Sequence, residues 1–188
     1  MMNLFDDPEK VNEYIKMSEA YNGRSLIEKL KEYLPHGSSL LEIGMGPGKD
    51  LDILSEVYHA TGSDRSKLFV NRYNAMHPNS QAVLLNAVDL NIDRTFQGIY
   101  SNKVLIHLSK NELEQSFQSQ LNILESGGIA FHSFWRGDKE ESFDGLRFVY
   151  YTIETIAPLI PPKFKLIYHY NYNEDSDNDS FAIILKKI

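Results

Sequence analysis

The stretch Leu40-Leu41-Glu42-Ile43-Gly44-Met45-Gly46-Pro47-Gly48 decides the fold. Residues 39–43 form an apolar run typical of a buried strand, and the helical spacing of Leu51, Leu54 and Tyr58 follows the three glycines. Glycine permits a positive φ and leaves room for a ligand beside bare backbone groups. In open α/β sheets, such a turn lies at the carboxyl ends of the strands, where ligands bind. The stretch therefore predicts an α/β fold with a ligand site at the glycine turn.

Strands and helices alternate along most of the remaining chain. Further strands are expected at residues 59–64, 82–85, 98–101 and 129–135. Helices are expected near 8–18, 26–34, 51–58, 68–73, 109–124 and 146–157, with Gly127-Gly128 as a helix C-cap and a polar loop over 136–145. The last part differs, because the alternating run 164–172 and the apolar run 181–185 flank an acidic loop and indicate an antiparallel hairpin. The pattern predicts a doubly wound, mostly parallel sheet with one reversed strand.

Composition and charge narrow the class of protein. The chain has 188 residues, of which 42% are hydrophobic and 24% charged, as expected of one globular domain. With 19 basic and 26 acidic residues the net charge is −7, which disfavours a nucleic-acid partner because such binding relies on clustered Lys and Arg. The absence of cysteine excludes disulfides, Cys-ligated zinc and thiolate catalysis. The acidic run 175–179 lacks the Gly and Glu of a calcium loop, so no metal site is expected.

No targeting or membrane signal is visible in the sequence. Residues 1–7 contain neither a basic region nor an apolar stretch, and no apolar run approaches the ~20 residues of a membrane span. We therefore expect a cytoplasmic protein without a membrane partner. The sequence carries no signal for an oligomeric state.

The spacing of the glycines bears on the ligand. Dinucleotide sites require G-x-G-x-x-G, whereas this chain has G-x-G-x-G, with Lys49 at the place of the last dinucleotide glycine. A G-x-x-x-x-G-K-[ST] phosphate loop is also absent. Asp64 follows Gly44 by twenty positions, at the end of the second strand, where a carboxylate can accept hydrogen bonds from two ribose hydroxyls. These features favour a nucleoside-containing cofactor without naming it.

From about Tyr21 to Leu185 the chain resembles the class I S-adenosylmethionine-dependent methyltransferases. Residues 40–48 resemble the first motif of that family, Gly62-Ser63-Asp64 its second, and 124–129 the segment before its fifth strand. The resemblance implies a Rossmann-like, seven-stranded sheet with a C-terminal antiparallel hairpin strand, and S-adenosylmethionine as cofactor. It also implies one domain over residues 1–188, with an N-terminal helical lid at 1–35 and an α/β core at 36–188.

The resemblance also implies which residues bind the cofactor. The glycine turn would contact the methionine part, Glu42 would orient the turn, and Asp64 would bind the ribose. Asn86-Ala87 falls where relatives have Asp-Ala beside the adenine, and Tyr21 falls in the lid segment. The full set of expected cofactor-binding residues is Tyr21, Glu42, Gly44, Met45, Gly46, Asp64, Arg65, Asn86, Ala87 and Asn102.

Methyl transfer is an in-line displacement that needs a general base only when the acceptor arrives protonated. His107 is the candidate catalytic residue, since the family often places its stretch, 104–108, at the mouth of the active site; a half-buried histidine at a helix start is the alternative. A small molecule is the expected acceptor and a protein side chain the second choice. Three further hypotheses are a binding module without turnover, a nicotinamide-dependent reductase and an aminopropyl transferase. The residues do not distinguish an O, N, S or C acceptor atom.

Overall fold

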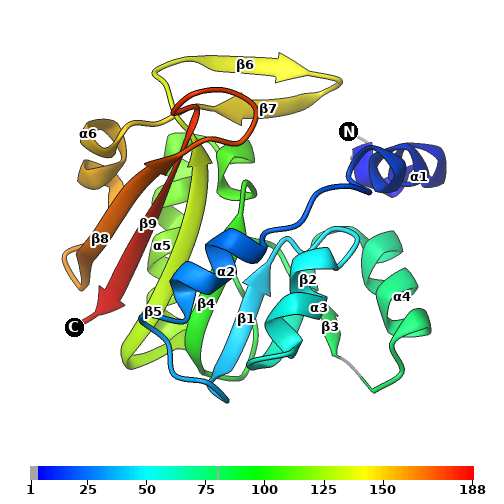
Figure 1. Cartoon of the computed structure of the whole chain (residues 1–188), viewed down its shortest axis with the longest axis horizontal. Coiled ribbons are helices and arrows are strands. Elements are labelled where there is room, and N and C mark those ends of the chain that lie inside the picture. The colour runs from blue at the N-terminus through cyan, green and yellow to red at the C-terminus, as the bar shows by residue number, and fades with distance from the viewer. Residues whose placement is uncertain (1–3, 80) are drawn as a thin grey trace.

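The structure is a computed structural model that describes residues 4–79 and 81–188. Its central sheet has seven strands in the order β3-β2-β1-β4-β5-β9-β8 (Figure 1). Strands β3, β2, β1, β4 and β5 are parallel, whereas β9 is antiparallel to both β5 and β8. The bounds are β1 Ser39–Ile43, β2 His59–Asp64, β3 Ala82–Leu84, β4 Phe96–Asn102, β5 Leu124–Trp135, β8 Phe164–Tyr172 and β9 Ser180–Lys187. The predicted doubly wound sheet with a terminal hairpin is confirmed.

Helices cover both faces of this sheet because each contributes one apolar stripe. Leu26, Ile27 and Leu30 of α2 pack with Ile53 and Leu54 of α3 against one face. The apolar stripe of α5 packs against the other face, and a third cluster joins α1, α3 and α4. The helices are η1 Leu4–Asp6, α1 Pro8–Met17, α2 Arg24–Leu30, α3 Lys49–Ser55, α4 Lys67–Met76, η2 Leu105–His107, α5 Lys110–Ile123, α6 Ile153–Ile156 and η3 Ala157–Leu159.

The expectation for residues 136–157 was wrong in its first half. The polar loop and the start of the expected helix form a β-hairpin, with β6 at Glu140–Phe143 and β7 at Leu146–Val149. Asp144 and Gly145 both have positive φ, 49° and 78°, which is the geometry of a two-residue hairpin turn. Figure 1 shows this hairpin above the carboxyl ends of the parallel strands, with α1 to one side. The hairpin thus lies over the edge where the ligand site is expected.

Two further expectations need correction. Gly127-Gly128 does not cap a helix: α5 ends at Ile123, and the glycines lie in an irregular part of β5, where Gly127 adopts a φ of 77°. In β8 a register shift between Leu166 and Tyr168 breaks the alternation, so Leu166 packs with the α5 side of the sheet and Tyr170 with the α2 side. In both places an irregularity in strand pairing replaces the simple local pattern.

A chain of buried polar groups crosses β4, β5 and α5 behind the carboxyl edge. His132 Nδ1 lies 2.8 Å from Ser101 Oγ, and its Nε2 lies 2.9 Å from Gln120 Oε1. Because an amide oxygen can only accept, Nε2 carries the proton and Nδ1 accepts from the serine hydroxyl. Ser101, His132 and Gln120 are fully buried, and burial lowers the pKa of His132 to about 3. The neutral histidine holds β4 in place directly beside Asn102.

We expect this histidine to make the fold sensitive to acid. The unfolded chain takes up a proton below the ordinary histidine pKa of 6.5, and the folded chain does so only near 3, so stability present above pH 6.5 is lost as the pH falls. Between about pH 7 and pH 5 the wild type should lose about 2 kcal/mol more than a His132→Gln variant. Urea unfolding at the two pH values measures the difference, and equal losses would contradict the prediction.

Candidate cofactor site

The turn after β1 can form only because its glycines have no side chain. Gly44, Gly46 and Gly48 have positive φ values of 70°, 51° and 90°. A Cβ on Gly44 would lie 2.4 Å from Val104 Cγ1, and one on Gly48 would lie 2.3 Å from the ring of Tyr73. Backbone conformation and close packing therefore both require glycine at these two positions. The turn exposes its backbone to a cavity at the carboxyl end of β1.

Asp64 joins the end of β2 to this turn. One carboxylate oxygen accepts a hydrogen bond from Gly46 N at 2.9 Å, and the other accepts one from Ser66 N at 2.8 Å. Burial raises the pKa of Asp64, and the two backbone hydrogen bonds oppose this rise. Asp64, the residue predicted to bind the ribose, therefore lies beside the turn predicted to bind the methionine part, at the edge of the same sheet.

A second carboxylate, Asp50 near the start of α3, connects three separate parts of the chain. It accepts hydrogen bonds from Gly23 N at 2.6 Å, from the Tyr100 hydroxyl at 2.9 Å and from Asn102 Nδ2 at 2.9 Å. Asn102 Nδ2 also donates to the Tyr21 hydroxyl at 2.5 Å. The segment between α1 and α2 is thereby tied over the glycine turn, with Tyr21 and Asn102 in direct contact.

Glu42 differs from both aspartates because it has no hydrogen-bond donor. Its side chain is 3% exposed, and its Oε2 atom has no partner among the described residues. Burial is the main cause that raises its pKa well above the usual value, and the nearby carboxylates of Asp50, Asp64 and Asp52 raise it further. An unpaired buried carboxyl facing a cavity marks the place where a ligand donor would be accommodated.

These residues surround one cavity of about 70 Å³. Six of the ten predicted cofactor residues line it: Tyr21, Glu42, Gly44, Met45, Gly46 and Asn102. Its lining also includes residues that the sequence analysis missed: Tyr14, Ser18, Pro47, Lys49 and Asp50. Asp50 carried a weak signal, as an acid in the first turn of the helix that follows the glycines, and the N-terminal residues carried none.

The other predicted residues lie outside this lining. Arg65 is exposed and directly follows Asp64. Asn86 is exposed, and its side chain accepts a hydrogen bond from Val88 N at 2.9 Å, so it stabilises the turn after β3. Ala87 is half-buried and packs against the core. The structure therefore brings the methionine and ribose ends of the predicted site together, with Asn86 and Ala87 apart from them.

His107, the predicted catalytic residue, is at the end of η2 beneath the β6–β7 hairpin. Its Nδ1 lies 2.7 Å from the carbonyl oxygen of Arg147, so Nδ1 carries a proton and Nε2 is left as the basic atom. The ring of Phe148 packs edge-on against the imidazole at a centroid distance of 4.8 Å. Burial, with a smaller effect of Arg65, lowers the pKa of His107, and the Arg147 carbonyl opposes this. The histidine is held as an oriented neutral imidazole.

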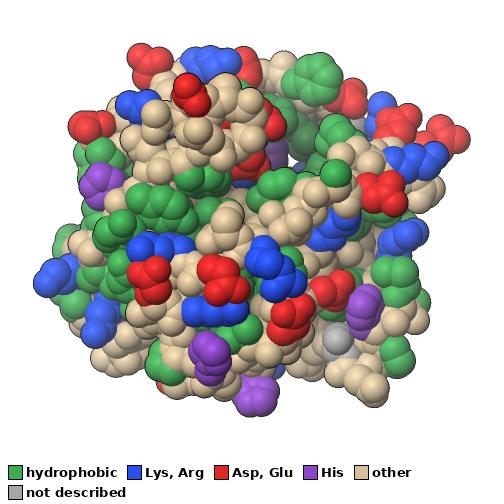
Figure 2. Space-filling view, in the orientation of Figure 1, with side chains coloured by type: hydrophobic (Ala, Val, Ile, Leu, Met, Phe, Trp, Pro, Cys, Tyr) green, Lys and Arg blue, Asp and Glu red, His purple; other side chains and the backbone are tan. Residues whose placement is uncertain are grey.

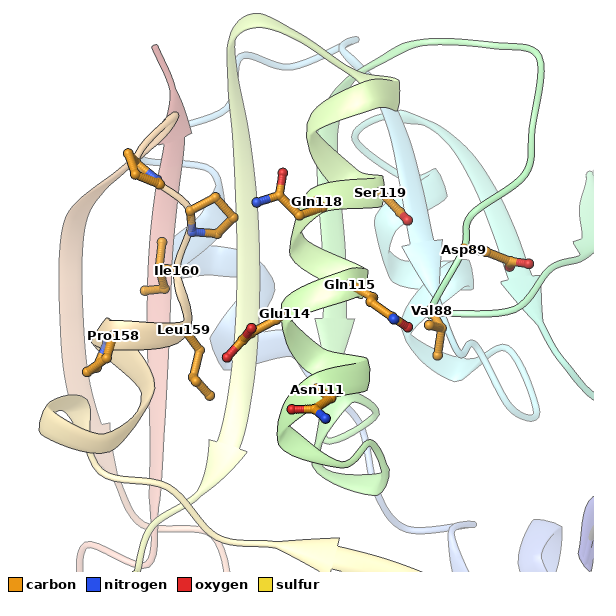
Figure 3. Close-up of a pocket in the computed structure, with 12 residues that line it drawn as sticks. Val88, Asp89, Asn111, Glu114, Gln115, Gln118, Ser119, Pro158, Leu159 and Ile160 are labelled. Carbon is orange, nitrogen blue, oxygen red and sulfur yellow. The ribbon is translucent and has the colours of Figure 1, made fainter.

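A second recess shares no lining residue with this cavity. It is a groove of about 740 Å³ between α5 and residues 158–162 (Figure 3). Polar side chains such as Glu114, Gln115 and Gln118 project from the helix on one side, and Leu159 and Ile160 lie on the other. None of the predicted site residues lines it, and the glycine turn does not border it. Its size alone does not make it the site.

Solved structures share the fold at low sequence identity. An S-adenosylmethionine-dependent methyltransferase from Clostridium acetobutylicum is 13% identical with a TM-score of 0.75, over 95% of this chain and 98% of that one. The N-methyltransferase NodS from Bradyrhizobium japonicum, solved with S-adenosylhomocysteine, is 14% identical with a TM-score of 0.70, over 94% and 98%. The 1,6-didemethyltoxoflavin-N1-methyltransferase from Burkholderia thailandensis is 15% identical with a TM-score of 0.75, over 87% and 77%. No curated protein matches the sequence significantly.

The family model described as a methyltransferase domain matches residues 40–128. This match runs from β1 into β5 and includes the glycine turn and Asp64. Over residues 40–128 the chain is similar to the methyltransferase domain family, and it shares the fold of the solved S-adenosylmethionine-dependent methyltransferases. In the described part of the chain, no helix has the length and apolar character to cross a membrane.

We expect Asp50→Asn to loosen the segment between α1 and α2. Asparagine replaces one of two acceptor oxygens by a donor, so one of the three donors around it loses its partner, at about 1–3 kcal/mol of unfolding free energy. Hydrogen exchange should rise at the amide of Gly23, which donates to Asp50. Glu125→Gln makes the same chemical change at an exposed position and should leave both quantities unaltered. Unchanged exchange at Gly23 would contradict the assigned contact.

Proposed function

We propose that the enzyme transfers the methyl group of S-adenosylmethionine to a small-molecule acceptor by in-line displacement. The observation that carries the choice of acceptor is the narrow entrance above the carboxyl edge. Figure 2 shows a recess there, and α1 approaches the tip of the β6–β7 hairpin through an ion pair between Lys10 Nζ and Asp144 Oδ2 at 3.3 Å. An entrance bordered from two sides favours a compact acceptor over a residue on the surface of a folded protein.

The binding roles follow from the placement of each group. Gly44, Met45 and Gly46 would hold the methionine part through their backbone, with Glu42 and Asn102 beside it. Asp64 would accept the ribose hydroxyls once the cofactor competes for its oxygens, and Arg65 would lie near the adenosine. Asn86 and Ala87 would approach the adenine from the turn after β3. S-adenosylmethionine supplies an already activated sulfonium, so the protein's contribution is alignment and exclusion of water.

We also propose that residues 1–188 form one domain in which residues 1–35 are a helical lid on the α/β core at 36–188. Residues 1–3 lie outside the described part of the chain. The cavity of about 70 Å³ is well below the roughly 300–1,000 Å³ typical of ligand sites. Tyr14, Ser18 and Tyr21 from the lid make up part of its wall. Cofactor entry therefore requires the lid to move away from the glycine turn.

His107 is proposed as the general base for an acceptor that arrives protonated. Its Nδ1 proton is engaged by the Arg147 carbonyl, which directs the lone pair of Nε2 away from the hairpin. A lowered pKa keeps the imidazole neutral and able to accept a proton at neutral pH. The proton would pass from the acceptor O–H or N–H to Nε2 as the methyl group is transferred.

The test of this function uses methyl-labelled S-adenosylmethionine with a cell extract divided by size into metabolites and macromolecules. Label transferred to the metabolite fraction supports the proposal. Label in protein would show that the second choice, a protein side chain, is correct. Thermal stabilisation by S-adenosylhomocysteine without any transfer would indicate a binding module. Extract and labelled donor incubated with heat-inactivated protein are the control for transfer that does not depend on this enzyme.

Asp64→Ala should weaken the binding of S-adenosylhomocysteine. Loss of hydrogen bonds between a carboxylate and two ribose hydroxyls should reduce affinity by roughly 1.5–3 kcal/mol, or about 10- to 150-fold. Isothermal titration gives the affinity. Glu125→Gln is the control, because this exposed acid on β5 has no part in the site. An Asp64→Ala protein that binds as tightly as the wild type would mean that the ribose lies elsewhere.

His107→Gln should lower the turnover of the acceptor by about 100-fold or more, in the range expected for loss of a general base. The wild-type rate should fall only when the pH drops below the ordinary histidine range, since the pKa of His107 is lowered, and the variant should lack this limb. Rates with the labelled donor over pH 5–8 measure both effects. Full activity in the variant would remove His107 from the mechanism.

A further inference from the structure

The two carboxyl groups in the cavity wall are held in opposite ways. Asp50 accepts three hydrogen bonds, one from a backbone amide, one from a phenol and one from a side-chain amide. Glu42 lies in the same wall, is equally inaccessible to bulk water, and receives no hydrogen bond from the described residues. An ionised carboxylate without a donor is costly to bury, whereas a protonated carboxyl is not. The cavity therefore pairs one fully satisfied acid with one unsatisfied acid.

Every element packed around Glu42 presents negative or neutral titratable groups. The carboxylates of Asp50 and Asp52 on α3 and of Asp64 on β2 lie near enough to raise its pKa, and Tyr100 is its neighbour on β4. Tyr14 and Tyr21 close the cavity from the N-terminal segment. Lys49 also lines the cavity, but its ammonium group donates to the carbonyl oxygen of Glu19. No cation within the described chain compensates Glu42, and burial together with the surrounding acids raises its pKa.

We propose that Glu42 holds a proton in the free enzyme and releases it to solvent when the α-ammonium group of the cofactor enters the cavity. This inference rests on the proposed function, because it needs the methionine end of the cofactor to lie at the glycine turn. The entering cation supplies both the charge and the N–H donors that Glu42 lacks, so the carboxyl becomes stable as an anion. Binding thus exchanges one proton for one ammonium group.

The direction of the pH effect follows from this exchange. A proton appears among the products of binding, so raising the pH favours the complex. Affinity should increase by up to about tenfold per pH unit between the pKa of Glu42 in the complex and its higher pKa in the free enzyme. The α-amino group of the ligand titrates only near about 7.7–8.0, so measurements at pH 5.5–6.5 keep it fully charged.

The experiment is isothermal titration of the full-length enzyme with S-adenosylhomocysteine at about pH 6, in two buffers of different ionisation enthalpy. The difference in heat gives the number of protons released. We expect a clear release, at most one proton, with S-adenosylhomocysteine and with S-adenosylmethionine. We expect none with 5′-methylthioadenosine, which has the nucleoside and the sulfur but lacks the ammonium group. This comparison uses only the wild-type protein and does not depend on the folding of a variant.

Glu42→Gln provides the second arm. Glutamine imitates the protonated carboxyl, so the variant should release no proton and should match the wild-type affinity at the acidic end of the range, losing its rise with pH. Glu125→Gln should behave as the wild type. Binding of S-adenosylhomocysteine without proton release would overturn the inference and leave the proposed function intact. Release with the sulfonium ligand alone would also overturn it, and absence of all binding would overturn the proposed function itself.

Discussion

The carboxylate of Asp50 is the contact on which the geometry of the site depends. Gly23 donates to it from the N-terminal segment, while Tyr100 and Asn102 donate from β4. A Cβ on Gly23 would lie 2.4 Å from Asp50 Oδ2, so the backbone of this segment approaches α3 as closely as glycine allows. One buried side chain thus fixes the distance between the N-terminal segment, the glycine turn and the end of β4. The polar groups that line the cavity are arranged around it.

Three buried carboxyl groups, those of Asp64, Asp50 and Glu42, differ in the hydrogen bonds that they receive. Asp64 is bonded to backbone amides that hold the turn in place, and Asp50 is bonded to donors from two distant segments. Glu42 has no donor. Asp64 and Asp50 accept hydrogen bonds within the folded chain, whereas the buried carboxyl of Glu42 still requires a hydrogen-bond donor. In the proposed complex, the positive charge and the N–H donors of the cofactor would meet this requirement, which would account for an otherwise unfavourable group in the cavity wall.

Parts of the fold that depend on residues close together in the sequence could be predicted from it. The apolar run of β1, the glycine turn and the helix near residues 109–124 all form where expected, and a capping box of Ser109 and Glu112 starts that helix. Asp144-Gly145 is a local hairpin signal too, but the charged residues on both sides of it suggested a loop. Asp50 could not be assigned from sequence, since its partners Gly23 and Tyr100 are 27 and 50 residues away. The sequence analysis named the glycine turn and Tyr21, which line the cavity, but it did not name Tyr14 or Ser18 from the same N-terminal segment.

The two sides of the cavity are also held by different forces. On the cofactor side, the glycine turn packs against Val104 and Tyr73 within the core and cannot move independently. On the entrance side, residues 18–22 are not buried, and hydrogen bonds rather than apolar packing hold them in place. All four residues of β6 are exposed, and the Lys10–Asp144 ion pair between α1 and the hairpin is exposed as well. An exposed ion pair contributes little to stability, so the entrance can open while the glycine turn stays fixed. Under the proposed function, specificity for the acceptor could accordingly change through α1 and the β6–β7 hairpin without disturbing the glycine turn.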